Sequence, residues 1–331
     1  MLEHGGGLRA AATRYGIALG DWLDLSTGIN PHGWPVPPVP PAVWQRLPEM
    51  DDGLETTAAA YYGTAHLLTT AGSQVAIQAL PRLREPGRVG VLHPSYAEHA
   101  HAWQQAGHQV ELLLPDQLDA AADRLDALVL VNPNNPTGKH FDPARLLNWQ
   151  VRLAEHGGWL VVDEAFMDAT PDHSLTPQVG LPGLIVLRSL GKFFGLAGAR
   201  VGFVLAEPAL RERLQEALGP WSVTGPSRWV AQQVLADHDR QAQTRQWLKQ
   251  AGQRLAELLR RQRLPVGGGT ALFQWVPLPE AGFWQDALAR RGILVRRFVD
   301  PPSLRFGLPG TEPHWRRLEL ALAGVRAERL C

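Results

Sequence analysis

The segments ALVLVNPNNPTG (127–138), WLVVDEAF (159–166) and LIVLRSLGK (184–192) decide the fold of this chain. Each begins with a short apolar run and ends in a polar cluster, and helical patterns separate them. Similar apolar runs lie at 89–92, 110–114 and 201–205. Apolar runs that do not alternate with polar residues indicate strands buried on both faces of a mostly parallel sheet. We therefore predict an α/β fold with helices on both faces of the sheet.

The organisation of the chain changes near residue 206, where the alternation of apolar runs and helical patterns stops. One long helical pattern follows at 227–263, and shorter strands and helices complete the chain. We predict a large domain over residues 41–225 and a small α+β domain over 226–331. Residues 1–40, which run into the proline-dense WPVPPVPP, would form a segment that packs with the small domain and the active site.

The composition narrows the possible classes of function. The 331 residues contain 32 Lys+Arg and 32 Asp+Glu, so the formal net charge is zero. This balance argues against nonspecific electrostatic binding to nucleic acid or to an anionic membrane. The single cysteine, Cys331, excludes an intramolecular disulfide and a cysteine-based metal site, and no metal is expected. The chain starts without a secretory pattern and has no apolar stretch suited to a membrane span, so we expect a soluble, cytoplasmic protein.

Two polar clusters lie where open parallel sheets bind ligands, beyond the carboxyl ends of strands or at the start of the helices. AGSQ (71–74) opens a helical pattern, and its backbone N–H groups suit a phosphate, although an ordinary N-cap at Ser73 would give the same pattern. Asp163 ends an apolar strand, where a buried carboxylate requires a cation or a strong donor. A helix cap or a solvated loop is the alternative for Asp163.

Lysine is rare in this chain, and only three of the 32 basic residues are lysines. One of them, Lys192, follows an apolar strand. In partly apolar surroundings the charged ammonium of a lysine is destabilised, which favours Schiff-base chemistry. A surface lysine is the alternative interpretation of Lys192. Ser189 and Arg200 could add a hydroxyl and a guanidinium for a phosphate. Together these groups predict a phosphate-bearing aromatic aldehyde held by Lys192, with Asp163 opposite a ring nitrogen.

Three motifs, NPNNPTG, VVDEAF and SLGKFFGLAGARVGF, occur in the order that is typical of the fold-type I pyridoxal-phosphate enzymes of the class I/II aminotransferase superfamily. The chain resembles this family over residues 55–205. The resemblance implies an aspartate aminotransferase-like fold, pyridoxal 5'-phosphate (PLP) as the cofactor, and a homodimer with shared active sites. It assigns to the cofactor Tyr61, Gly72, Ser73, Gln74, Tyr96, Asn135, Asp163, Ser189, Lys192 and Arg200.

The resemblance also implies a role for each of these residues. The catalytic pair would be Lys192, which binds the cofactor aldehyde and moves protons at the substrate Cα, and Asp163, which keeps the pyridine nitrogen protonated. Asn135 would donate to the 3-oxygen of the ring, and Tyr96 would stack on its face. The others would hold the phosphate: Ser189, Arg200, the backbone of Ser73 and Gln74 in the turn after Gly72, and Tyr61 from the neighbouring subunit.

Two features bear on the reaction. The N-terminal His4-Gly5-Gly6, followed by LDLSTGINPHG, resembles the start of the threonine-phosphate decarboxylases of cobalamin biosynthesis, and a flexible glycine-rich terminus is the alternative. Phe166 replaces the tyrosine that typical aminotransferases carry after DEA, a departure shared with that decarboxylase group. A neutral exchange within a broad superfamily is the alternative for Phe166.

A small amino acid that bears a carboxylate and a phosphate needs two cationic anchors. The resemblance assigns the phosphate to Arg296 and the α-carboxylate to Arg305, and it leaves open whether Arg297 takes the place of Arg296. The short loop between the two arginines departs from the pattern of the group. Four residues would complete the substrate site: His4, Gly5, Asn30 and Asn135.

The resemblance therefore implies PLP-dependent decarboxylation of L-threonine O-3-phosphate to (R)-1-amino-2-propanol O-2-phosphate in cobalamin biosynthesis. A histidinol-phosphate aminotransferase or a related class I/II aminotransferase is the alternative. A PLP-fold binding protein without turnover is a third class, which the intact set of Lys192, Asp163, Asn135 and Arg305 disfavours.

Overall fold

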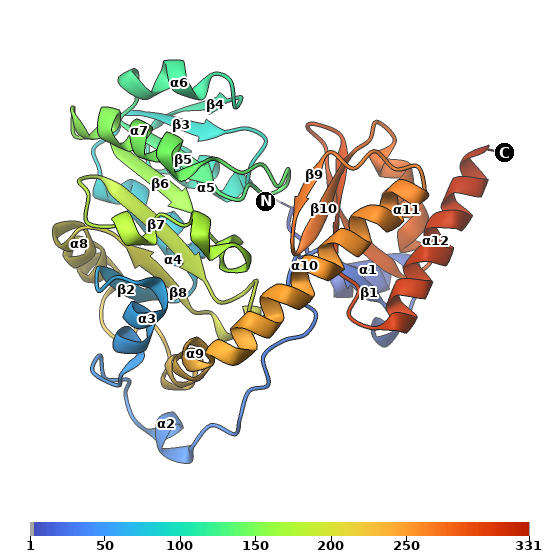
Figure 1. The fold of residues 1–331 in the computed structure, drawn as a ribbon, viewed down its shortest axis with the longest axis horizontal. Helices are drawn as coiled ribbons and strands as arrows, with labels where there is room; N and C mark the ends of the chain where they lie inside the picture. The colour runs from blue at the N-terminus through green and yellow to red at the C-terminus, as the bar shows by residue number, and fades with distance from the viewer. Residues whose placement is uncertain (1–2, 331) are drawn as a thin grey trace. The chain divides into compact units, whose positions relative to one another are not determined.

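The computed structural model describes residues 3–330 and divides the chain into two compact units, each with its own sheet (Figure 1). Among the described residues, the larger unit comprises 33–135 and 140–243, and the smaller unit comprises 3–32, 136–139 and 244–330. Cys331 lies outside the described residues.

A seven-stranded sheet forms the centre of the larger unit, in the order β2-β8-β7-β6-β5-β3-β4. Neighbouring strands from β7 to β4 are parallel, and β8 is antiparallel to both β2 and β7. The strands are β2 (Leu67–Thr70), β3 (Arg88–Leu92), β4 (Gln109–Leu113), β5 (Ala127–Val131), β6 (Trp159–Asp163), β7 (Leu184–Ser189) and β8 (Gly202–Leu205). The mostly parallel sheet matches the prediction.

Both faces of this sheet are covered, as the continuous apolar runs predict. Every residue of β5, β6 and β7 is buried. Val129 and Val161 belong to a core cluster with residues of α4, α5 and α8, and their neighbours on the opposite face, such as Leu128 and Leu160, are equally buried. The α/β class and its buried central strands are therefore confirmed.

The helices of the larger unit begin and end at identifiable signals. For example, α7 begins at Pro143 because the Asp142 carboxylate accepts the Ala144 N–H at 2.8 Å, which satisfies one unpaired donor of the first turn. The helices are α2 (Pro41–Gln45), α3 (Leu54–Tyr62), α4 (Ser73–Ala79), α5 (Ala97–Gln105), α6 (Leu118–Ala121), α7 (Pro143–Ala154), α8 (Pro208–Leu218) and α9 (Gly225–Ala236). Short 3-10 turns lie at Leu80–Leu83, Ala122–Arg124, Met167–Ala169, Pro171–His173, Thr176–Gln178 and Ala197–Ala199.

The single helix predicted at 227–263 is wrong, because the segment forms two helices, α9 and α10 (His238–Arg261). Asp237 leaves the helical conformation between them, and its carboxylate accepts hydrogen bonds from the Trp34 indole and the Arg240 N–H, each at 3.2 Å. An aspartate that binds nearby donors in this way competes with helix propagation.

Helix α9 packs with the larger unit, whereas the sequence analysis placed residues 226–243 in the small domain. Its Arg228 side chain is 2% exposed and bonds to two carboxylates, Asp52 at 2.7 Å and Glu55 at 2.6 Å. A buried guanidinium needs such partners, and both lie at the start of α3. This contact explains why α9 belongs to the unit that carries the seven-stranded sheet.

The smaller unit contains a five-stranded sheet in the order β1-β11-β12-β10-β9. The N-terminal segment contributes β1, which is parallel to β11, while the other neighbouring pairs are antiparallel. The strands are β1 (Leu23–Leu25), β9 (Gly268–Thr270), β10 (Phe273–Pro277), β11 (Ile293–Phe298) and β12 (Ser303–Gly307). Its helices are α1 (Leu8–Tyr15), the later part of α10, α11 (Ala281–Ala289), α12 (Glu312–Leu330) and the 3-10 turn Leu19–Asp21.

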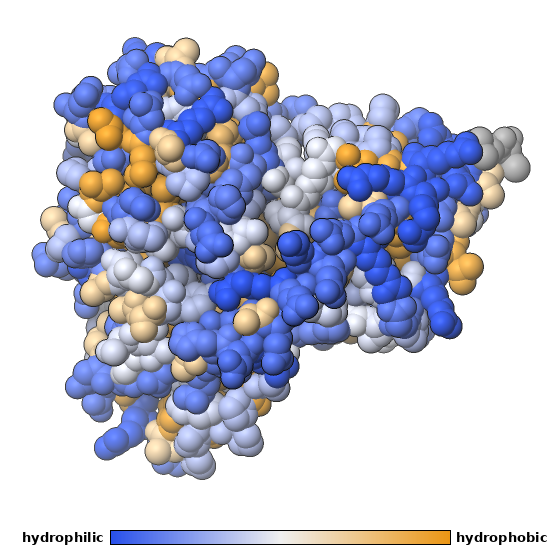
Figure 2. All heavy atoms as spheres, viewed as in Figure 1, coloured by the Kyte–Doolittle hydropathy of each residue, from blue (hydrophilic) through white to orange (hydrophobic). Residues whose placement is uncertain are grey.

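The face of the protein drawn in Figure 2 is mostly polar. Figure 2 shows hydrophilic residues over much of the visible face, with scattered apolar groups between them. Within residues 3–330, no helix combines the length and apolar character needed to cross a membrane.

Candidate active site

The parallel strands β5, β6 and β7 bring three polar clusters to one edge of the large sheet. Val131 is paired with Asp163 across β5 and β6, and Asp163 is paired with Leu187 across β6 and β7. The carboxyl ends of these strands therefore lie side by side, as the sequence predicted. Asp163, the loop after β5 and the turn after Ser189 meet at this edge.

Asp163 is 3% exposed and has two strong partners. Its Oδ2 lies 2.9 Å from Nε2 of His99, and its Oδ1 accepts the Ala165 N–H at 3.0 Å. His99 is itself 1% exposed. Because a buried carboxylate is costly without donors, these contacts explain how Asp163 can lie at the end of a buried strand, and they exclude a solvated loop.

His99 is a further residue of the site, which the sequence motifs did not indicate. It lies in α5, three residues after Tyr96, and residues at that spacing share one face of a helix. The two rings meet edge to face, with centroids 6.1 Å apart, and the Tyr96 hydroxyl donates to Gln74 at 3.1 Å. The start of α5 thus places Tyr96 and His99 together, and this helical spacing is the signal that could have found His99.

Lys192 lies in the turn after β7 and is only partly exposed. Its Nζ lies 5.6 Å from the centroid of the Phe166 ring, which is 3% exposed. In the same turn, the Ser189 hydroxyl accepts the Gly191 N–H at 3.2 Å. The amine therefore has an apolar aromatic neighbour, which is the environment that the sequence analysis expected for a reactive lysine.

The AGSQ turn lies against the Arg200 side chain, with no space between them for a further side-chain atom. We call this arrangement the phosphate cradle. Helix α4 starts at Ser73 with Gly72 as its N-cap, so Ser73 is not the N-cap serine of the alternative interpretation. A Cβ on Gly72 would lie 2.7 Å from Nη2 of Arg200, and a Cβ on Gly202 would lie 2.6 Å from the Ser73 nitrogen. The glycines keep the Ser73 N–H and the Arg200 guanidinium close together, as a phosphate requires.

Gln74 and Asn135 have different surroundings. The Gln74 side chain donates to Glu98 at 2.9 Å, in addition to accepting from Tyr96. Asn135 is half-buried in the loop after β5. In that loop Asn134 donates to the Pro94 carbonyl at 2.8 Å, which fixes the loop conformation before Asn135.

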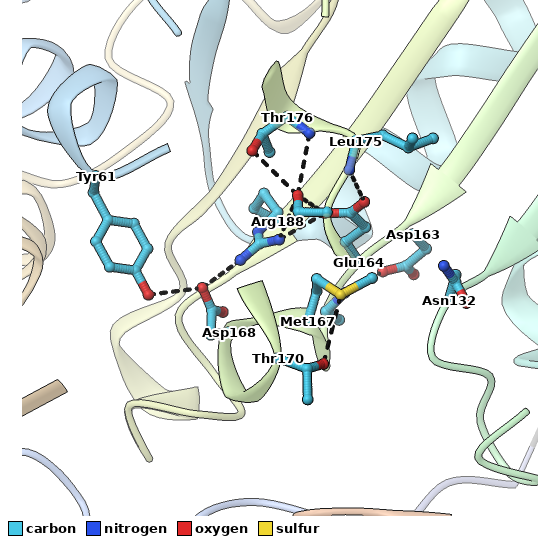
Figure 3. Close-up of polar contacts among 12 residues, drawn as sticks. Tyr61, Asn132, Asp163, Glu164, Met167, Asp168, Thr170, Leu175, Thr176 and Arg188 are labelled. Carbon is cyan, nitrogen blue, oxygen red and sulfur yellow. Dashed lines mark hydrogen bonds and ion pairs between the residues drawn. The ribbon is translucent and has the colours of Figure 1, made fainter. Parts of the chain in front are cut away.

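A second buried polar group, which we call the Arg188 cluster, comprises Arg188, Glu164 and Asp168 (Figure 3), together with Ser174, whose hydroxyl donates to Glu164. Arg188 is 2% exposed and forms ion pairs with Glu164, at 2.6 Å, and with Asp168. Burial raises the pKa of Glu164, although Arg188 opposes that shift. Because Glu164 follows Asp163 and Arg188 precedes Ser189, the cluster ties together the strand ends that carry the candidate site.

The Arg188 cluster also reaches Tyr61. The Tyr61 hydroxyl donates to Oδ1 of Asp168 at 3.0 Å, within its own chain (Figure 3). The contact that the resemblance assigns to Tyr61, with a phosphate of the neighbouring subunit, stays a prediction.

The smaller unit pairs two of the predicted substrate residues. Arg296 and Arg305 are directly opposite each other on the antiparallel strands β11 and β12, so their side chains leave the same face of the sheet. Arg297 leaves the other face, where its Nη1 lies 3.2 Å from the position of a Cβ on Gly282. The short loop between β11 and β12 is what sets the two arginines opposite each other.

The N-terminal HGG segment lies against Ser26 in the smaller unit. The Gly6 N–H donates to the Ser26 hydroxyl at 2.8 Å, and a Cβ on Gly5 would lie 2.3 Å from the Ser26 carbonyl oxygen. Gly6 has a φ of 85°, which also favours glycine. Both glycines are therefore required by the local geometry, in contrast to the alternative of an unstructured terminus.

The two remaining substrate candidates also lie in the smaller unit. His4 is exposed and directly precedes the glycines that contact Ser26. Asn30 is 3% exposed, and its Oδ1 accepts the His32 N–H at 2.9 Å. The backbone turn that this bond closes fixes the Asn30 side chain.

The larger unit fits PLP. It offers a lysine amine beside an aromatic ring, a buried carboxylate held by a histidine, and a glycine-bounded cradle with a guanidinium. The lysine amine suits the aldehyde of PLP, and the buried carboxylate suits its pyridine nitrogen. The glycine-bounded turn with its guanidinium suits the phosphate. Among residues 3–330, no group of three or more His, Cys, Asp or Glu side chains is arranged to hold a metal ion.

Comparisons with known proteins agree with this fit. The family model for aminotransferase class I and II matches residues 21–318. A threonine-phosphate decarboxylase from Pseudomonas aeruginosa is 59% identical over 98% of each chain, and one from Sinorhizobium sp. is 41% identical over 97% of this chain and 98% of that protein. A solved histidinol-phosphate aminotransferase from Sinorhizobium meliloti, in complex with pyridoxal-5'-phosphate, aligns with a TM-score of 0.86 and 20% identity over 98% of this chain and 95% of that chain. This last likeness shows the fold.

Proposed function

Because this chain belongs to the class I and II aminotransferase family, we propose that it is a PLP-dependent enzyme that decarboxylates L-threonine O-3-phosphate. The product would be (R)-1-amino-2-propanol O-2-phosphate, and the pathway cobalamin biosynthesis. The near full-length identity of 59% to a threonine-phosphate decarboxylase supports this activity over transamination of histidinol phosphate.

The observation that carries the substrate class is the cross-strand pair Arg296 and Arg305. Like charges directly opposite each other in a sheet repel, so the pair is stabilised by an anion on that face. A substrate with a carboxylate and a phosphate supplies one anion for each guanidinium. We assign the phosphate to Arg296 and the carboxylate to Arg305, as the family resemblance implies. A guanidinium can bind either group in bidentate geometry.

In the larger unit, Lys192 would bind the cofactor aldehyde, and Arg200, Ser189 and the AGSQ turn would hold its phosphate. When bound, PLP supplies an electron sink for the electron pair that remains at Cα after CO2 leaves. Asp163 keeps the pyridine nitrogen protonated, and the His99 contact holds its carboxylate in place. Once the substrate amine has taken its place at the aldehyde carbon, the free Lys192 amine would return a proton to Cα.

Three further residues adjust this chemistry. Tyr96 would stack on the ring, and Asn135 would donate to the ring's 3-oxygen. Phe166 cannot donate to that oxygen, because it carries no hydroxyl, so Asn135 is left as the donor from this part of the chain. His4, Gly5 and Asn30 complete the binding of the substrate.

We also propose that the protein is a cytoplasmic homodimer with shared active sites, in which Tyr61 reaches the cofactor phosphate of the neighbouring subunit. Large apolar side chains exposed on the larger unit support an interface there, since such groups are unfavourable in water. Trp44 is 68% exposed and Leu47 63%, and Met50 and Trp221 line one groove. Sedimentation equilibrium of the holoenzyme should give twice the chain mass, and Trp221→Arg with Met50→Arg should lower it.

The activity is tested by offering the holoenzyme two substrates. L-Threonine O-3-phosphate should release CO2 without any 2-oxo acid. Histidinol phosphate with 2-oxoglutarate should give no glutamate. Glutamate formation without CO2 release from threonine phosphate would overturn the proposal in favour of an aminotransferase.

A further inference from the structure

Arg296, the proposed phosphate anchor, is bonded to Glu3 in this structure. Its Nη1 lies 3.2 Å from Oε2 of Glu3, and its Nη2 donates to the Glu3 carbonyl oxygen at 2.7 Å. The Arg296 side chain is only 16% exposed, whereas that of Glu3 is 79% exposed. The guanidinium is therefore largely fixed in the protein, and its carboxylate partner lies in the solvent-exposed N-terminal segment.

The same segment also reaches the partner arginine, through Ser26. The Ser26 carbonyl oxygen accepts from Nη2 of Arg305 at 2.7 Å, and the Ser26 hydroxyl accepts from the Gly6 N–H. Gly5 approaches that same carbonyl so closely that no Cβ fits. Residues 3–6, which we call the N-terminal strap, are thus bonded directly to Arg296 and, by way of Ser26, to Arg305.

The strap supplies the negative charge that the arginine pair requires. Two guanidinium groups on one face of a sheet repel each other, and the Glu3 carboxylate offsets part of that repulsion. A phosphate dianion that binds Arg296 would offset more of it, but the same guanidinium donors are already used by Glu3. A phosphate that binds at Nη1 of Arg296 therefore competes with the Glu3 carboxylate, whereas the bond from Nη2 to the Glu3 carbonyl is a backbone contact of the strap.

We propose that Glu3 is a built-in competitor for the substrate phosphate at Arg296, and that it sets how strongly anionic a ligand must be to bind there. This inference rests on the proposed function only in taking Arg296 as the phosphate anchor. A phosphate, with two charges and several acceptor oxygens, displaces the single exposed carboxylate, whereas an uncharged side chain does not. Gly5 and Gly6 keep the strap attached at Ser26 after Glu3 has left.

The test is the affinity of the holoenzyme for inorganic phosphate, measured by isothermal titration calorimetry. Glu3→Gln removes the competing charge and leaves the backbone bonds of the strap in place. Because exposed ion pairs are weak, the dissociation constant of the Glu3→Gln holoenzyme for phosphate should be about twofold to fivefold lower than that of the unchanged protein. The dissociation constant for unphosphorylated L-threonine should not change, because that ligand brings no anion to Arg296.

Two controls separate competition from a general change of surface charge. Glu312→Gln removes an exposed carboxylate that pairs with Arg254 in the same unit, and it should leave phosphate binding unchanged. In an Arg296→Ala background, Glu3→Gln should have no further effect on phosphate binding. An unchanged or increased dissociation constant for phosphate in Glu3→Gln alone would overturn the inference, and so would an equal gain in the Arg296→Ala background.

The readout is phosphate binding and not turnover, so the two proposals can fail separately. If Glu3→Gln leaves phosphate binding unchanged while threonine phosphate still releases CO2, only the competitor role of Glu3 is wrong. If phosphate binds and Glu3 competes but no CO2 is released, the proposed reaction is wrong.

Discussion

Oδ2 of Asp163 and Nε2 of His99 lie 2.9 Å apart, and both side chains are almost completely buried. The contact joins the end of β6 to α5, the helix whose N-cap residue is Tyr96. A carboxylate in this setting can keep a cationic ring nitrogen charged only if its own orientation is fixed. His99 supplies that restraint from behind the carboxylate.

Replacing His99 with leucine should weaken cofactor binding. The change leaves the buried Asp163 with fewer donors, at a cost of about 1–3 kcal/mol, so the PLP dissociation constant should rise by about fivefold or more. His108→Leu is the matched control, because His108 is also buried in the larger unit and contacts the Pro81 carbonyl. Fluorescence titration with PLP should show a loss for His99→Leu alone; equal losses in both variants would indicate a general loss of stability.

Replacing Lys192 with alanine should abolish the absorbance band of lysine-bound PLP. An arginine cannot replace the lysine, because its guanidinium stays protonated, so Lys192→Arg should lose the band as well. Lys139→Ala and Lys249→Ala should keep it. A spectrum of Lys192→Ala that retains the band after dialysis would show that another group holds the cofactor.

The two neighbouring arginines of β11 should differ in effect because they leave opposite faces of the strand. Arg296→Ala removes charge-assisted hydrogen bonds worth about 1.5–3 kcal/mol, so the KM for threonine phosphate should rise by about tenfold or more. Its effect on the binding of unphosphorylated threonine should be small. Arg297→Ala is the control; if it raises the KM as much as Arg296→Ala does, the face assignment is wrong.

Replacing Arg188 with methionine should destabilise the protein. The change leaves the buried carboxylates of Glu164 and Asp168 without their cation, at a cost of about 3–5 kcal/mol in the free energy of unfolding. Arg152→Met breaks an exposed ion pair with Asp123 and should cost less than about 1 kcal/mol. Urea unfolding of both variants measures the difference in the free energy of unfolding. Similar losses would show that the buried ion pairs of Arg188 stabilise the fold no more than an exposed ion pair does.

Acid should remove the stabilising effect of Asp52. Partial burial would raise the pKa of this carboxyl, but hydrogen bonds from Arg228 and the Leu54 N–H outweigh that effect and lower its pKa. A lowered pKa in the folded state stabilises the protein above the pKa of the unfolded chain, about 3.9, and this contribution is lost as the pH falls through the folded value. Asp52→Asn should therefore cost stability at neutral pH and progressively less below about pH 4, as urea unfolding would show; a cost independent of pH would contradict this.

The sequence predicted the candidate site in the larger unit better than that in the smaller one. Asp163 and Lys192 follow apolar runs, and in a parallel sheet the ends of such runs meet at one edge whatever the details of packing. His99 was missed because its spacing of three residues from Tyr96 shows only that the two side chains can lie on one side of the helix. The spacing does not show that this side faces the end of β6. The break at Asp237 was missed because it depends on the indole of Trp34, far away in the chain.

The relation between Arg296 and Arg305 could not be read from the sequence, because it depends on the register of two strands. A shift of one residue would move one of the two side chains to the other face. The short loop between them looked like a departure from the family pattern, yet it is this loop that aligns them. Glu3 was missed for a similar reason, since its partner lies at the other end of the chain.

The central claim is that the enzyme removes the carboxylate of threonine phosphate and keeps its phosphate ester. The most direct measurement follows holoenzyme and L-threonine O-3-phosphate, without any 2-oxo acid, by phosphorus NMR and CO2 trapping. One new phosphate ester should form, with one CO2 released for each molecule of substrate consumed. Consumption of substrate without CO2, or CO2 only when a 2-oxo acid is added, would contradict it.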